Sequence, residues 1–295
     1  MMQGWVGFGA VRAMVLAVAL TGSGPFVQGG AQAQVSLIPI ESQTQADARD
    51  RLQAFLQVTG FDVALDSIAL AARDAPMMLG MQAEDFGADW SRMAEEVFAP
   101  NVMRGMALDI LEKTLSDEVL HHAAEFYGSD LGQQLVAVEN ASHMVEDDEA
   151  KLDEGAGLLD RADQGRRSVL ERLVTAIDSN SVGLIAVREV QVRFLMAASA
   201  AGILVGGFDE ATLRALLAEQ DGELRETLKA NALRNAAFTY KDISSADLSV
   251  YVAALEDPKM QQLYELMNAI QFEVMANRFE VLAGRMANLH PGQAL

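Results

Sequence analysis

The sequence predicts an all-α protein built from two tandem, related helical bundles that follow a signal peptide. Aromatic residues make up only 6% of the chain, whereas the strong helix formers Ala, Leu, Met, Glu and Gln are abundant. Apolar residues recur at helical spacing almost continuously from Ala46 onward. One helix–corner–helix pattern also occurs twice, which predicts an internal duplication.

Composition excludes several classes of function. The formal net charge of −20 argues against a nucleic-acid partner, because a phosphate backbone selects clustered Lys and Arg. The absence of cysteine rules out disulfides, thiol catalysis and cysteine-bound zinc. No dinucleotide-binding glycine pattern follows a strand, so we expect no cofactor.

Residues 1–33 have the pattern of a signal peptide. Arg12 precedes the apolar run Ala13–Leu20, and Ala31-Gln32-Ala33 fits a small-x-small cleavage pattern that leaves Gln34 as the new N-terminus. A membrane anchor is the alternative, but an eight-residue run is too short for a bilayer core, which needs about 20 residues. We expect a periplasmic or secreted protein with no transmembrane span after cleavage.

The first bundle is predicted over residues 46–150. Pro39 favours an extended segment over residues 34–45. Apolar periodicity then predicts helices over residues 51–58, 63–72 and 84–98, and Pro100 suits the first turn of another helix.

Residues 151–167 are predicted to form an acidic, glycine-containing linker. The acidic run 146–149 precedes glycines at 155, 157 and 165, a composition typical of linkers or frayed helix ends. The second bundle is expected over residues 168–295, with helices over residues 209–218, 222–240 and 258–289. The apolar stretch Phe194–Phe208 is too short for a membrane span and suits a core helix.

The repeated pattern aligns residues 115–141 with residues 243–269 without gaps. The alignment contains seven identities in 27 pairs, where about two are expected by chance. Ser116 and Ser244 are natural N-caps, and each copy then has a corner followed by Gln-Gln-Leu. Arg51-Leu52 and Arg172-Leu173, 121 residues apart, are aligned as the starts of the two copies.

The first copy resembles an exported bacterial family, the domain of unknown function 2059. The resemblance rests on a Ser-acid-Glu helix start and a Phe-Tyr-x-Ser corner, with Asp130 where the family usually has proline. The second copy resembles the family more faintly. The matching positions, for which the resemblance implies a structural role, are Ser116, Glu118, Leu120, Phe126, Tyr127, Ser129, Gly132, Gln133, Leu135, Ser244, Asp247, Leu248, Asp257, Pro258, Gln261 and Leu263. It implies an exported, helical protein and carries no established activity, so it assigns no catalytic residues.

The main alternative to a structural role for the first copy of the motif is a metal site. Glu118 and His122 are four residues apart, as are His121 and Glu125, a spacing that can hold a divalent cation on one helix face. Adjacent histidines point about 100° apart, however, and there is no H-E-x-x-H pattern. We therefore expect no metal site.

The sequence thus favours a non-catalytic interaction or ligand-holding module for a protein or a small apolar ligand. Two alternatives stay open: a metal-dependent hydrolase that uses the four residues above, and a periplasmic chaperone whose methionine-lined grooves bind apolar segments.

Overall fold

The computed structural model describes residues 40–87, 89–178, 182–204, 209–286 and 289, and in this part of the chain it is all-helical, without β-strands. The predicted all-α class is therefore confirmed. The α-helices are α1 (Ile40–Thr59), α2 (Phe61–Ala71), α3 (Asp89–Val97), α4 (Pro100–Thr114), α5 (Asp117–Tyr127), α6 (Asp130–His143), α7 (Asp148–Arg161), α8 (Gln164–Ile177), α9 (Val182–Ala200), α10 (Glu210–Ala218), α11 (Asp221–Thr239), α12 (Ser245–Leu255) and α13 (Pro258–Met286), with short 3₁₀ helices η2 (Ala72–Leu79) and η3 (Ala83–Phe86).

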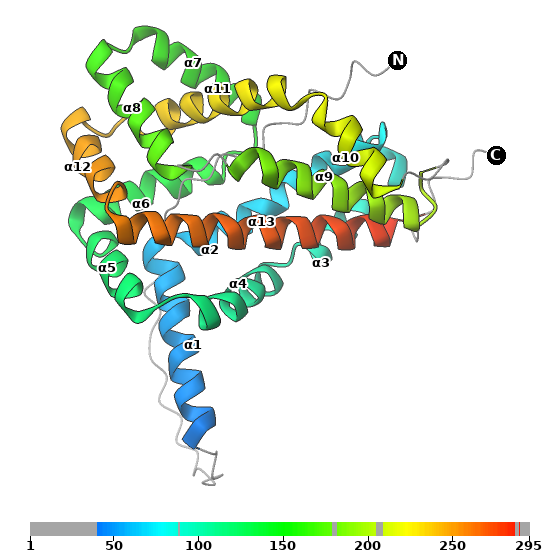
Figure 1. Cartoon of the computed structure of the whole chain (residues 1–295), viewed down its shortest axis with the longest axis horizontal. Helices are drawn as coiled ribbons and strands as arrows, with labels where there is room; N and C mark the ends of the chain where they lie inside the picture. Colours follow the sequence, from blue (N-terminus) through cyan, green and yellow to red (C-terminus); the bar gives the residue numbers. More distant parts are fainter. Residues whose placement is uncertain (1–39, 88, 179–181, 205–208, 287–288, 290–295) are drawn as a thin grey trace.

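The long helix α13 lies at the centre of the fold (Figure 1). It packs along α9 on one side and contacts α2, α3, α4 and α5 on the other. The amino-terminal part of α1 projects away from the body, as Figure 1 shows. The last helix in the sequence thus joins elements from both predicted bundles.

The two predicted bundles show a similar pattern of helix contacts. In the first, α1 contacts α2, α4, α5 and α6, while α2 contacts α4 and α6. In the second, α8 contacts α11, α12 and α13, and α9 contacts α11 and α13. With α1, α2, α4, α5 and α6 matched in order to α8, α9, α11, α12 and α13, most contacts have a counterpart. This agreement supports a duplication, which stays an inference.

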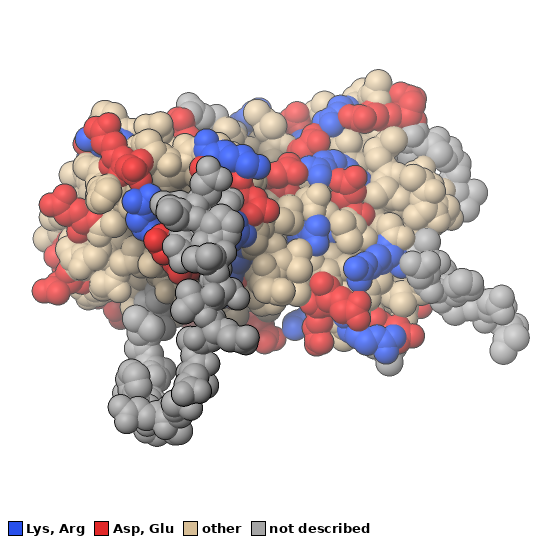
Figure 2. Space-filling view, turned by 90° about the horizontal axis from the view of Figure 1, so that it is seen from below, with Lys and Arg blue, Asp and Glu red and all other residues tan. Residues whose placement is uncertain are grey.

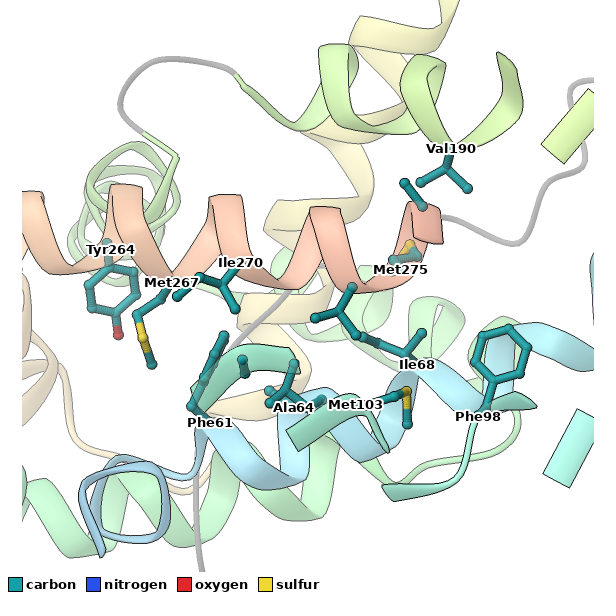
Figure 3. Packing of buried hydrophobic residues seen from close by; sticks show 14 of the residues in the cluster. Phe61, Ala64, Ile68, Phe98, Met103, Val190, Tyr264, Met267, Ile270 and Met275 are labelled. Carbon is teal, nitrogen blue, oxygen red and sulfur yellow. The ribbon is translucent and has the colours of Figure 1, made fainter. Parts of the chain in front are cut away.

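A single apolar core runs through both halves. Figure 3 shows Phe61, Ala64 and Ile68 of α2 facing Met267 and Ile270 of α13, with Met103 of α4 beside them. Phe98, before α4, and Phe194 of α9 both contact Phe279 of α13 edge-on, with ring centroids 5.3 and 6.1 Å apart. The halves therefore do not have separate cores.

Two segment predictions require correction. Residues 40–45, expected to be extended, are already part of α1. Residues 151–167, expected to be a linker, form most of α7 and the start of α8. Gly155 lies in the interface between α7 and α11, where an added Cβ would stand 2.2 Å from the carbonyl oxygen of Arg234. Here glycine permits close helix packing, so it does not mark a chain break. The predicted signal peptide, residues 1–33, lies outside the described residues.

Within the described residues, no single helix has both the length and the apolarity of a membrane span. The segments Ala46–Thr59 and Phe61–Leu79 meet that test only as a pair, and the pair is bent by 73°.

Candidate functional site

The family-like corner between α5 and α6 is fixed by two serine caps. Ser116 accepts a hydrogen bond from the backbone N–H of Val119 at 3.3 Å, and Ser129 accepts one from Gly132 at 3.0 Å. Gly132 lies so close to the preceding helix that a Cβ would stand 2.2 Å from the carbonyl oxygen of Phe126. The sequence around this corner therefore specifies both helix starts and their close approach.

The second corner, between α12 and α13, is built in a similar way. Ser244 accepts from the backbone N–H of Asp247 at 3.0 Å, and its hydroxyl donates to the Asp247 carboxylate at 2.6 Å. Asp257 accepts from the backbone N–H of Lys259 at 2.8 Å, and Pro258 is the first residue of α13.

A glutamine braces each corner with the same pair of contacts. The side-chain amide of Gln133 donates to the carbonyl oxygens of Tyr127 at 2.6 Å and Val58 at 3.3 Å. Gln261 donates likewise to Leu255 at 2.5 Å and Ala176 at 2.8 Å. Each amide ties its corner to the end of the helix that opens its half, α1 or α8. The acceptors on these opening helices, Val58 and Ala176, are 118 residues apart, whereas the Arg-Leu pairs are 121 residues apart.

The remaining predicted motif positions serve packing. Four leucines that follow the helix starts or the glutamines are buried, namely Leu120, Leu135, Leu248 and Leu263. Phe126 stacks on the ring of Tyr251 with centroids 5.7 Å apart and an interplanar angle of 8°. The motifs of the two halves therefore meet each other directly.

A buried cluster of tyrosines lies where these motifs meet. The hydroxyl oxygen of Tyr127 is 2.6 Å from that of Tyr264 and 3.4 Å from that of Tyr251, and the latter two are 2.8 Å apart. The hydroxyl of Tyr240 donates to Oε1 of Glu139. These four are all the tyrosines of the sequence, and each is at most 5% exposed. We call Tyr127, Glu139, Tyr240, Tyr251 and Tyr264 the tyrosine–glutamate cluster.

Glu139 is the only carboxylate in this cluster and is completely buried. Burial raises its pKa well above the ordinary value, because a charge in an apolar interior loses its hydration, and the hydrogen bond from Tyr240 only partly opposes this rise. Its Oε2 atom has no hydrogen-bond partner among the described residues. Burial also raises the pKa of each of the four phenols. Burial therefore favours the neutral form of each member of the cluster. Tyr264 also lines a pocket of about 190 Å³ beside α8 and α13.

The residues of the metal alternative do not converge on one point. The carboxylate of Glu118 pairs with Lys259 at 2.7 Å, and Nε2 of His122 lies 3.1 Å from Asp257. His121 is exposed, with its Nδ1 2.6 Å from the carbonyl oxygen of Asp117. Across the described residues, no group of three or more His, Asp or Glu side chains is arranged to hold a metal ion. Two of the four candidates instead bind the first half to the second corner.

An open pocket of about 530 Å³ lies between α1, α4 and α5. Four leucines line it, of which Leu115 is partly exposed and Leu52, Leu111 and Leu120 are at most 6% exposed. Its charged residues are Arg51, Glu112, Lys113 and Asp117, of which Arg51 pairs with Asp117 at 3.1 Å. Figure 2 shows acidic and basic side chains interspersed over the face seen from below, without a large area of one sign.

A protein-family model matches the segment that contains the first corner. Residues 101–160 match the DUF2059 model. This family is described as an uncharacterized protein conserved in bacteria, and the match confirms the resemblance for the first copy. No curated protein and no solved structure shows a significant match to the chain. The DUF2059 segment contributes Tyr127 and Glu139 to the cluster, whereas the other three tyrosines come from the second half.

Sequence reasoning found Tyr127 but missed the rest of the cluster. A signal was present, because Tyr251 and Tyr264 fall inside the second copy of the motif and Tyr240 lies just before it. Glu139 also occupies the apolar stripe of its helix, four residues after the buried Leu135. A carboxylate at such a position indicates a polar partner in the core.

Proposed function

We propose that this protein is an exported, non-catalytic helical protein of the bacterial envelope that holds a partner in the pocket between α1, α4 and α5. One observation carries the proposal: the strongly perturbed titratable groups and the open pocket are in different places. Catalytic sites typically combine a cleft with groups whose pKa values are shifted. Here Glu139 and the four tyrosines are buried, and none of them lines this pocket. Tyr264 lines a separate, smaller pocket of about 190 Å³.

The lining of the pocket suits recognition. Leu115 offers partly exposed apolar surface, and the charged rim carries two basic and two acidic residues. An apolar centre with a polar rim is the usual anatomy of a protein interface. An amphipathic segment of a partner polypeptide matches this combination better than a wholly apolar ligand does.

Export is the second part of the proposal and rests on the sequence. The apolar run and the Ala31-Gln32-Ala33 pattern support signal cleavage. A fold without cysteine needs no oxidation to become stable, so its stability comes from apolar burial.

Site-specific photo-crosslinking in living cells tests the proposal. A photoreactive residue at Lys113, on the rim of the pocket, is expected to give a discrete adduct that the same residue at Lys229, an exposed position on α11, does not give. Fractionation of the same cells is expected to place the adduct in the periplasm or the medium. Equal adducts from both positions, or an adduct found only in the cytoplasm, would contradict the proposal.

A further inference from the structure

Arg166 locks the corner between α11 and α12 in the second half. Its Nη2 donates to the carbonyl oxygen of Tyr240 at 2.5 Å and its Nη1 to that of Ile243 at 2.9 Å. The side chain is partly buried against the corner. A planar guanidinium is suited to holding two acceptors at once. The second half thus has an internal arginine bound to the end of a helix.

The first half has the same arrangement of helices but no arginine at the corresponding position. The contacts of Gln133 and Gln261 relate α1 to α8 by 118 residues, which matches Arg166 to Ala48. The aligned corners differ by 128 residues, which matches Tyr240 to Glu112 and Ile243 to Leu115. The first half therefore has the methyl group of Ala48 where the second half has the guanidinium group of Arg166.

All three counterparts, Ala48, Glu112 and Leu115, line the open pocket of about 530 Å³. Among the described residues, no backbone N–H of the loops and caps donates to the carbonyl oxygens of Glu112 or Leu115, and the nearby Arg49 donates to the carboxylates of Asp109 and Glu112. Glu112 lies in the last turn of α4, where carbonyl groups lack partners within the helix and carry the negative end of its dipole. By this correspondence, the pocket is the counterpart of the place that the Arg166 side chain fills in the other half.

We propose that this pocket binds the guanidinium group of an arginine presented by a partner polypeptide. The inference rests on the proposed interaction function and specifies the chemistry of the partner. The carbonyl groups of Glu112 and Leu115 would accept the N–H groups, as their counterparts do from Arg166. The partly exposed Leu115 offers a contact for the methylene stem of the side chain. The net charge of −20 favours approach of a basic partner.

The carboxylates at the rim are already paired with arginines, so the two carbonyl groups are the main acceptors left for a ligand. Arg51 pairs with Asp117 at 3.1 Å, and Arg49 pairs with Glu112 at 2.6 Å. Both rim carboxylates are thus occupied by arginines of α1, in exposed pairs of the kind that contribute little to stability.

Calorimetric titration of the full mature chain at low salt tests the chemistry. One probe is a hexapeptide with a single arginine between leucines, and its control carries citrulline, which has nearly the same shape without the charge. We expect the arginine peptide to bind at least tenfold more tightly than the citrulline peptide. Equal affinities, or no heat from either peptide at millimolar concentration, would overturn the inference. A blocked single arginine that binds as tightly as the peptide would contradict the polypeptide source and indicate a small guanidinium ligand.

Two variants test the location. Ala48→Arg is expected to fill the pocket from within, raise the midpoint temperature of unfolding and abolish peptide binding. Arg166→Ala is expected to create a second site, so that methylguanidinium at low millimolar concentration restores part of its lost midpoint temperature, whereas urea at the same concentration does not. Unchanged peptide binding by Ala48→Arg, or no selective rescue of Arg166→Ala, would count against the assignment.

The crosslinking experiment separates this inference from the proposed function. If the adduct at Lys113 persists in cells while the arginine peptide fails to bind, the pocket holds a partner of other chemistry and only the arginine inference is lost. If the peptide binds but no adduct forms in cells, the chemistry stands and the proposed function is lost.

Discussion

Replacing Glu139 with glutamine should remove most of the pH dependence that this residue gives to folding. The carboxyl group is fully buried, and burial raises its pKa in the folded protein well above the ordinary value of 4.5. Glutamine has nearly the same shape, and its amide oxygen can still accept the hydrogen bond from Tyr240. The substitution therefore changes the titration and leaves the packing largely intact.

The magnitude follows from proton linkage. Above about pH 4.5 the unfolded chain releases the Glu139 proton and the folded chain keeps it, so raising the pH favours unfolding. The contribution of Glu139 is fully favourable below that pH and is lost as the pH rises towards the folded pKa. While only the folded state stays protonated, the free energy of unfolding falls by about 1.4 kcal/mol per pH unit. Two units correspond to about 2.7 kcal/mol.

Urea denaturation followed by circular dichroism, at several pH values between 5.5 and 7.5, measures this difference. The four phenols that surround Glu139 stay neutral in this range because burial raises their pKa values. Other carboxylates are shared by both proteins, including Asp62, whose pKa is also raised by burial, and they cancel in the comparison. Glu125→Gln, on the exposed face of α5, makes the same chemical change at the surface and should stay within about 0.5 kcal/mol of the wild type. Parallel curves for the wild type and Glu139→Gln would refute the reasoning.

Three further outcomes are expected from urea denaturation of single variants. Gly155→Ala should destabilise the protein by about 1–3 kcal/mol, because its Cβ would meet backbone at 2.2 Å. Gly157→Ala should be neutral or stabilising by up to about 1 kcal/mol, because its Cβ meets only a flexible arginine side chain at 3.3 Å. Equal effects of the two substitutions would contradict the packing. Gln133→Ala and Gln261→Ala should each cost about 1 kcal/mol, since each amide braces two carbonyl groups; a loss confined to one of them would argue against equivalent roles. Tyr264→Phe removes a hydroxyl that contacts two other buried phenols and should cost about 1–3 kcal/mol; an unchanged midpoint would show that the hydroxyl network adds no stability.

The starts of many helices were predictable from the sequence, because they depend on neighbouring residues. Ser116 and Ser244 cap helices where the sequence places them, and Pro100 and Pro258 begin helices. Each of these signals acts within one turn, through a hydrogen bond or a fixed dihedral angle. For the same reason, the all-helical class followed from composition and spacing alone.

Features that depend on contacts between distant parts of the chain were harder to predict from the sequence. Gly155 indicates a chain break when only its neighbours are considered, and only its contact with α11 shows that it permits close packing. The tyrosine–glutamate cluster joins residues up to 137 positions apart, and nothing local to Glu139 identifies Tyr240 as its donor. The meaning of the open pocket depends on a long side chain that the first half lacks, since Ala48 stands where the second half has Arg166. This difference is visible only when α1 is compared with α8.

The central position of α13 has a consequence for how the chain is made. Ribosomes release a protein from its amino terminus, and early segments often fold before later ones emerge. Here α2 and α4 find part of their apolar cover in a helix that is synthesised near the end. Nascent chains of this protein therefore expose part of this apolar surface until α13 is synthesised. A chain truncated before Pro258 lacks the helix that covers it.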